Sequence, residues 1–215
     1  MADTGGGQEK FTALWPTIFM QASLPGHDLA NREIEKVIAS LERDNRALTT
    51  DYLADNFLLH EHPAVAWLRD CVQQTVMRYL AHIGITYEVE WGVQAWPNVN
   101  RFGDYHDPHN HPHAYLSGTY YVAVPKDMET LETRNDVRPG RITFYDPRYG
   151  ANMTAIRDDP QIEAEHTIEP EPGLILLWPA FINHFVHPNL SKSPRISVSF
   201  NVMLKWNESY LPEQG

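Results

Sequence analysis

The spacing of apolar residues along the chain changes character near Gly84. Before it, residues 29–44 and the segment from Pro63 to Gly84 repeat apolar positions every three or four residues, which is helical spacing. Asp28 stands at the N-cap position of the first predicted helix, and Pro63 occupies the first turn of the second. The chain therefore predicts two amphipathic helices. We expect the apolar stripe of the first to consist of Leu29, Ile34, Val37, Ile38 and Leu41.

After Gly84 the apolar segments are short, rich in β-branched and aromatic residues, and bounded by Pro and Gly. They predict strands at residues 87–98, 114–125, 141–146, 161–168, 174–178, 182–187 and 195–204. Pro16 interrupts an apolar run in residues 11–21, which favours a further strand at a sheet edge. Two helices followed by about seven antiparallel strands indicate a mainly β sandwich or barrel of the jelly-roll type.

The length of 215 residues fits one domain covering residues 1–215. Within it we expect a flexible tail at 1–10, an N-terminal strand and two helices at 11–86, and a β core at 87–206. The polar connections at 126–140 and 147–160 are long for a compact β domain, and such loops often serve as lids or recognition elements.

Charge and cysteine content narrow the function classes. Seventeen Lys and Arg against 28 Asp and Glu give a net charge of −11, which argues against a nucleic-acid partner. The single cysteine excludes a disulfide framework and a cysteine-based zinc cluster. With no signal peptide pattern and no apolar run of membrane-spanning length, we expect a cytoplasmic protein without a membrane partner. A homodimer through the helices or an edge strand fits a domain of this size.

Four of the 11 histidines fall between residues 106 and 113. In an extended chain His109 and His111 point to the same face and would form half of a metal site. Imidazole ligands suit Fe, Zn, Cu and Ni alike, so this pair does not select the metal. His106 or His113 could replace one partner, and a solvated histidine-rich loop is the alternative interpretation.

Two later strands offer partners for this pair. His184 and His187 lie on opposite faces of the strand at 182–187, so at most one joins the site, and we expect His187 to be a hydrogen-bonded core residue. In the strand at 195–204, polar residues alternate with apolar ones. Arg195 and Ser197 on its polar face could grip a carboxylate, because the guanidinium offers a bidentate fork and the hydroxyl a third donor.

Taken in order, NHPHAYLSGTYYV, RITFYDPR, PGLILLWPAFINHFVHPN and RISVSFN resemble the Fe(II)/2-oxoglutarate-dependent oxygenases over roughly residues 91–201. The pattern is closest to a bacterial branch with an H-x-H-P…S-G-x-Y-Y-V signature. The resemblance implies a cupin-like double-stranded β-helix that holds Fe(II). It also implies 2-oxoglutarate and O₂ as co-substrates and hydroxylation of a small molecule or protein side chain. The metal ligands would be His109, His111 and His184, and the oxoacid would bind Arg195 and Ser197, with Tyr121 as a further cofactor-binding candidate.

His111 departs from the family pattern, which usually has Asp or Glu at this position. Three neutral imidazoles leave the metal centre one unit more positive. Asp104 and Asp107 are nearby carboxylates without the usual spacing. A three-histidine cupin enzyme that uses no oxoacid, such as a thiol dioxygenase or an isomerase, is therefore one alternative. A non-catalytic β-sandwich that binds a ligand is another.

Overall fold

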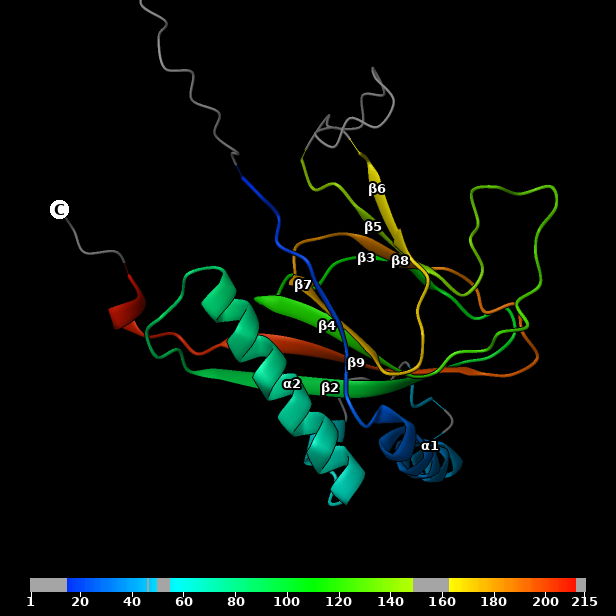
Figure 1. Cartoon of the computed structure of the whole chain (residues 1–215), viewed down its shortest axis with the longest axis horizontal. Coiled ribbons are helices and arrows are strands. Elements are labelled where there is room, and N and C mark those ends of the chain that lie inside the picture. The colour runs from blue at the N-terminus through cyan, green and yellow to red at the C-terminus, as the bar shows by residue number, and fades with distance from the viewer. Residues whose placement is uncertain (1–14, 46, 50–54, 149–162, 212–215) are drawn as a thin grey trace, which may run out of the picture.

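The computed structural model describes residues 15–45, 47–49, 55–148 and 163–211, in which two antiparallel sheets face each other (Figure 1). The larger sheet has the order β1-β7-β4-β9-β2. Its strands are β1 (Met20–Ser23), β7 (Leu174–Pro179), β4 (Leu116–Ala123), β9 (Arg195–Leu204) and β2 (Trp91–Asn100). The smaller sheet has the order β3-β8-β5-β6. Its strands are β3 (His106–His109), β8 (His184–Val186), β5 (Ile142–Tyr145) and β6 (Glu165–Ile168). The predicted jelly-roll class is confirmed.

Most strand predictions match in position and differ at their ends. The strand at 195–204 has the predicted bounds, whereas the N-terminal strand, at the sheet edge as expected, forms at Met20–Ser23 and shares only two residues with the predicted run at 11–21. The sequence pattern missed β3, because its four residues HDPH include a proline and show no apolar alternation. The expected tail at 1–10 and residues 149–160 of the second long connection lie outside the described residues.

Two helices, α1 (His27–Asp44) and α2 (Pro63–His82), cover the outer face of the larger sheet (Figure 1). Short 3₁₀ turns at Phe57–Leu59 and Glu208–Tyr210 complete the described elements. No helix in the described ranges combines the length and apolar character needed to cross a bilayer.

The start of α1 corrects two expectations. Its N-cap is Gly26, with φ of 78°, so Asp28 lies in the first turn, where a carboxylate still complements the helix dipole. Leu29 is 73% exposed and does not belong to the buried stripe. Asn31 takes part in that stripe instead: its Nδ2 donates to the Val122 carbonyl at 2.8 Å, and its Oδ1 accepts from the Tyr120 hydroxyl at 2.5 Å. A buried polar residue is invisible to an apolar pattern, and this one attaches α1 to β4.

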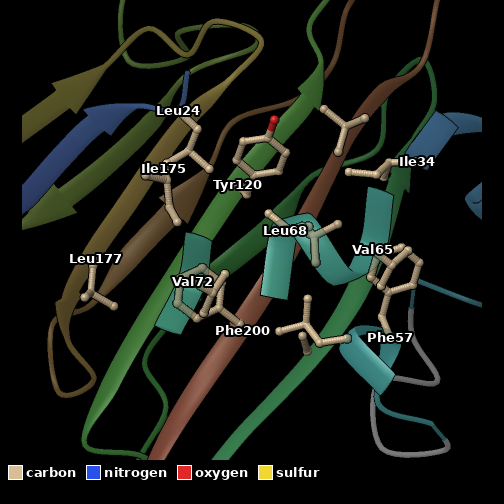
Figure 2. Close-up of a cluster of buried hydrophobic side chains, with 14 of the residues drawn as sticks. Leu24, Ile34, Phe57, Val65, Leu68, Val72, Tyr120, Ile175, Leu177 and Phe200 are labelled. Carbon is tan, nitrogen blue, oxygen red and sulfur yellow. The ribbon is translucent and has the colours of Figure 1, made fainter. Parts of the chain in front are cut away.

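The main hydrophobic core lies between the helices and the larger sheet (Figure 2). The helices contribute Ile34, Val65, Leu68 and Val72, and the sheet contributes Tyr120, Ile175, Leu177 and Phe200. Successive side chains of a strand point to opposite faces of the sheet. Because Val198, Phe200 and Val202 of β9 are buried on this side, the polar side chains of β9 face the other sheet. The core therefore fixes which face of the larger sheet is available for a site.

Candidate active site

The space between the two sheets holds a cavity of about 640 Å³. Its floor is the inner face of β2, β4 and β9, and β3, β8 and β5 contribute residues from the opposite sheet. The candidate residues His109, His111, His184, Arg195, Ser197 and Tyr121 all line this cavity. The structure thus brings together all six residues that the sequence analysis proposed.

The three candidate metal ligands converge at one point of the wall. His109 pairs directly with His184 in the β3–β8 register, and their ring centroids are 4.3 Å apart. His111 lies 5.1 Å from His109 and 5.3 Å from His184 by ring centroids. One nitrogen from each ring lies within 4.8 Å of the other two. Such a set of imidazole nitrogens fits a divalent first-row metal.

The backbone conformation that places His111 in this cluster differs from the extended strand that we expected. Strand β3 ends at His109, so strand alternation does not orient His111. Instead its N–H donates to the Ala180 carbonyl at 2.9 Å, and its carbonyl accepts from the Ala114 N–H at 3.0 Å. A turn that is hydrogen-bonded to the residue after β7 therefore places the His111 ring beside the other two.

Hydrogen bonds and burial prepare the rings for a cation. The Nδ1 atoms of His109 and His184 lie 2.5 Å from the Asp107 carbonyl and 3.2 Å from the Ile182 carbonyl. A carbonyl only accepts, so each Nδ1 carries the proton and each Nε2 keeps its lone pair for a metal. Burial, reinforced by His109, lowers the pKa of His184 to about 3 and of His111 to about 4. Both are therefore neutral at pH 7, as metal binding requires.

The other histidines stay outside this cluster. His106 lines the cavity, but its Nε2 contacts Asn100 Nδ2 at 3.1 Å, and burial lowers its pKa to about 4. His113 lines the cavity without joining the group of converging nitrogens. His187 is buried, accepts from the Arg138 N–H at 3.2 Å and contacts Thr143 Oγ1 at 2.8 Å, as expected of a core histidine.

The nearby acids do not enter the metal cluster either. Among the described residues, Asp104 and Asp107 are not part of the group whose ligand atoms converge. Asp104 accepts from the backbone N–H of Arg101 at 2.7 Å, and Asp107 contributes its backbone carbonyl to His109. The donor set is therefore three imidazoles without a carboxylate.

Arg195 is a buried cation without a counter-ion. It is 1% exposed, and no Asp or Glu of the described residues lies within ion-pair distance of it. Its Nη1 donates to the carbonyl of His187 at 3.2 Å, its Nη2 donates to Asn100 Oδ1 at 3.2 Å, and its Nε has no partner. Burying an unpaired charge is costly, so this arrangement favours an anionic ligand. The free Nε and the surrounding donors fit a carboxylate.

Hydroxyl groups flank the guanidinium. Ser197 follows two residues along β9 on the same face, and Tyr121 of β4 lies opposite Ser197 in the strand register. Burial raises the pKa of Tyr121 to about 12, while Arg195 acts in the opposite direction. The phenol therefore stays protonated and able to donate.

Trp178 and Asn201 are among the residues that contact the histidine cluster and that the sequence analysis did not propose for the site. Trp178 packs edge-on against His184 at 5.0 Å, and Asn201 Nδ2 lies 3.3 Å from His111 Nδ1. The alternation in β9 placed Asn201 on the polar face, but its partner is 90 residues away in sequence. No local signal could have linked the two.

Comparison with known protein families decides between the interpretations. The family described as "Putative 2OG-Fe(II) oxygenase" matches residues 94–201, half of the chain, including all six candidate site residues. The chain belongs to the 2OG-Fe(II) oxygenase family. This match confirms the resemblance inferred from the motifs. The family depends on Fe(II), 2-oxoglutarate and O₂, so this oxygenase depends on them as well. A comparison with curated protein sequences finds no match.

Solved structures share the fold of this oxygenase at low sequence identity. A prolyl-4-hydroxylase from Pseudomonas putida aligns with a TM-score of 0.54 at 16% identity, covering 87% of this chain and 88% of that one. A prolyl hydroxylase from Trichoplax adhaerens, in complex with a hypoxia inducible factor peptide, gives 0.57 at 14% identity over 86% and 83%. AviO1 from Streptomyces viridochromogenes gives 0.53 at 11% identity over 90% and 91%. These similarities concern the jelly-roll fold.

Proposed function

We propose that this oxygenase couples the oxidative decarboxylation of 2-oxoglutarate to the hydroxylation of a substrate. His109, His111 and His184 would hold the iron, and Arg195, Ser197 and Tyr121 would hold the oxoacid. The observation that carries the proposal is the presence, in one cavity, of three converging imidazoles and a buried guanidinium without a counter-ion. The oxoacid-independent cupin assigns no role to that guanidinium.

The residues of the proposed site have different functions. Iron, when bound, supplies the redox chemistry that activates O₂ and links loss of CO₂ from the oxoacid to oxidation of a substrate C–H bond. Arg195 provides a positive charge for the far carboxylate of the oxoacid, and the hydroxyls of Ser197 and Tyr121 provide further hydrogen bonds. Because the proposed donor set consists of three imidazoles, it contains no carboxylate that would repel this dianion. Trp178 and Ile142 add apolar surface to the cavity wall, which limits water around the reacting atoms.

We propose further that the substrate presents an uncharged or anionic group on a small molecule or a protein side chain. Of the described residues that line the cavity, Arg195 alone is a formally charged type. The rest of the floor carries amides, hydroxyls and one indole, from Gln94, Asn98, Thr119, Ser199 and Trp96. A lysine or arginine side chain would find no carboxylate to pair with among the described lining residues. The prolyl substrates named for two of the similar structures are uncharged, in keeping with this class.

Formation of succinate tests the reaction. Protein loaded with Fe(II) under nitrogen, then given 2-oxoglutarate and air, is expected to form succinate slowly even without substrate. The His109→Ala variant should form none, whereas a His82→Ala control, altered at an exposed histidine of α2, should match the unmodified protein. Absence of succinate, together with no binding of 2-oxoglutarate to the metal-loaded protein, would support the oxoacid-independent cupin instead.

Stimulation of succinate formation tests the substrate class. Short peptides with a central prolyl, asparaginyl or aspartyl residue are compared with lysyl and arginyl peptides of the same flanking sequence. Stimulation confined to the lysyl or arginyl peptides would contradict the proposed charge preference.

A further inference from the structure

The third histidine differs from the other two in what contacts its Nδ1 atom. In His109 and His184 a backbone carbonyl fixes the proton on Nδ1. Nδ1 of His111 instead faces the side-chain amide of Asn201, at 3.3 Å from Nδ2. An amide offers a donor on one side and an acceptor on the other, so its orientation decides which tautomer His111 adopts.

The side-chain amide of Asn201 bridges His111 and Ser117. Asn201 Nδ2 donates to His111 Nδ1, and Asn201 Oδ1 accepts from the Ser117 hydroxyl. A neutral imidazole whose Nδ1 accepts carries its proton on Nε2 and has no lone pair there for a metal. Turning the amide by half a turn places its oxygen against His111. The ring then holds its proton on Nδ1 and frees Nε2, as in the other two histidines.

Ser117 permits both orientations. Its hydroxyl donates to the amide oxygen in one and accepts from the amide nitrogen in the other. Ser117 lies directly opposite Asn201 in the β4–β9 register, and it is 1% exposed. A buried hydroxyl that can reverse its role keeps the amide paired in either state, so neither orientation leaves an unsatisfied polar group on that side.

We propose that Asn201 is a positioning residue for His111 and that, with a metal bound, its amide oxygen accepts a hydrogen bond from His111 Nδ1. The proposal rests on the proposed function of His111 as a ligand. The two other rings take their orientation from the backbone, whereas His111 lies on a turn, where its Nδ1 contacts this side chain. A ligand-orienting hydrogen bond of this kind typically changes metal affinity by about 10- to 100-fold when it is removed.

The tautomers can be observed directly. In protein labelled with ¹⁵N-histidine, the imidazole shifts are measured without metal and after addition of Zn(II), a diamagnetic probe that three imidazoles can bind. With Zn(II) bound, we expect His111 to carry its proton on Nδ1, as His109 and His184 do. A His111 that carries its proton on Nε2 with Zn(II) bound would overturn the proposal.

Metal affinity provides a second measurement, by competition between the protein and a chelator for Zn(II). Asn201→Leu removes both hydrogen bonds at similar volume and should weaken binding about 10- to 100-fold. Asn201→Asp can only accept, so it should bind at least as tightly as the unmodified protein. The control Asn31→Leu makes the same change where the Asn31 amide joins α1 to β4, on the opposite face of the larger sheet, and should leave the affinity unchanged.

The variants separate this proposal from the function on which it rests. If Asn201→Leu binds Zn(II) as tightly as the Asn31→Leu control, or if Asn201→Asp binds as weakly as a folded Asn201→Leu, the positioning role is refuted. The Asn201→Asp comparison with unmodified protein stands even where Asn201→Leu fails to fold. If His111→Ala itself retains the affinity, the proposed ligand set is wrong, a different outcome from loss of the Asn201 effect alone.

Discussion

His109 and His184 lie directly opposite each other in the β3–β8 ladder, with ring centroids 4.3 Å apart, although 75 positions separate them in the chain. The pairing of two short strands thus makes the first half of the candidate metal centre. The second half, His111, is added by a turn that hydrogen-bonds to Ala180. The candidate centre therefore depends on the smaller sheet and its connections, while the residues proposed to bind the oxoacid lie on the larger sheet.

Removal of a ligand should abolish tight metal binding. We expect His184→Ala to weaken Co(II) affinity by more than about 100-fold, because it removes a direct ligand rather than an outer hydrogen bond. His106→Ala removes a cavity histidine outside the converging group and should leave the affinity within a few fold. The visible spectrum of the Co(II) protein measures both. Equal losses in the two variants would contradict the assignment of ligands.

Replacement of the buried guanidinium of Arg195 should weaken the binding of 2-oxoglutarate and leave the free energy of unfolding nearly unchanged. Arg195→Met is expected to lose about 10- to 100-fold in affinity for 2-oxoglutarate, as for the loss of a charge-assisted hydrogen bond. Its free energy of unfolding should change by no more than about 1 kcal/mol, because an unpaired buried charge is costly to keep. Calorimetric titration of Zn(II)-loaded protein and urea unfolding provide the measurements. Arg141→Met, at a partly exposed Glu169 ion pair, is the control and should retain the affinity.

Restoring the usual carboxylate should reveal the charge effect of His111. We expect His111→Asp to retain metal binding and to lower the affinity for 2-oxoglutarate by about 10-fold, because the added negative charge repels a dianion. Titration of succinate, which carries two carboxylates as well, gives a second comparison. An increase in oxoacid affinity in the variant would show that the neutral donor set does not favour the anion.

Acid should destabilise the protein through its buried histidines. Burial, aided by Arg138, lowers the pKa of His187 to about 4, whereas an unfolded histidine titrates near 6.5. Between these values the unfolded state binds the proton and the folded state does not, so stability falls as pH drops from about 6.5 to about 4. We expect His187→Gln to reduce this loss by about 1–3 kcal/mol in urea unfolding at several pH values. His82→Gln, on the exposed side of α2, should leave the pH profile unchanged.

The glycine of the S-G-x-Y-Y-V signature, Gly118, allows close packing against Phe200 and the backbone of Leu176. A Cβ on Gly118 would lie 2.6 Å from Cε2 of Phe200 and 2.7 Å from the backbone oxygen of Leu176. Gly118→Ala should therefore cost about 1–3 kcal/mol of unfolding free energy, as overpacking does. Adding Phe200→Leu should recover part of this loss in thermal unfolding. A Gly118→Ala variant as stable as the unmodified protein would contradict this explanation.

The sequence by itself determined the two helices, the long β9 strand and the division of β9 into a polar and an apolar face. These features follow from periods of 3.6 and 2, which are local properties of the chain. The order of the motifs also sufficed to indicate the family, and the family match confirms it. Asp28 and Leu29 were misassigned because a turn at Gly26 shifted the start of α1, which a periodicity alone does not resolve.

Only the tertiary structure decided which groups meet. Strand β3 acquires its conformation by pairing with β8, and the contact between Asn201 and His111 joins positions 90 residues apart. The burial of Arg195 with no carboxylate of the described residues within ion-pair distance likewise depends on several elements that are far apart in the sequence. Strand register and the burial of a charge depend on contacts between residues that are far apart in the sequence. A local sequence pattern contains no information about these contacts, so it does not predict them.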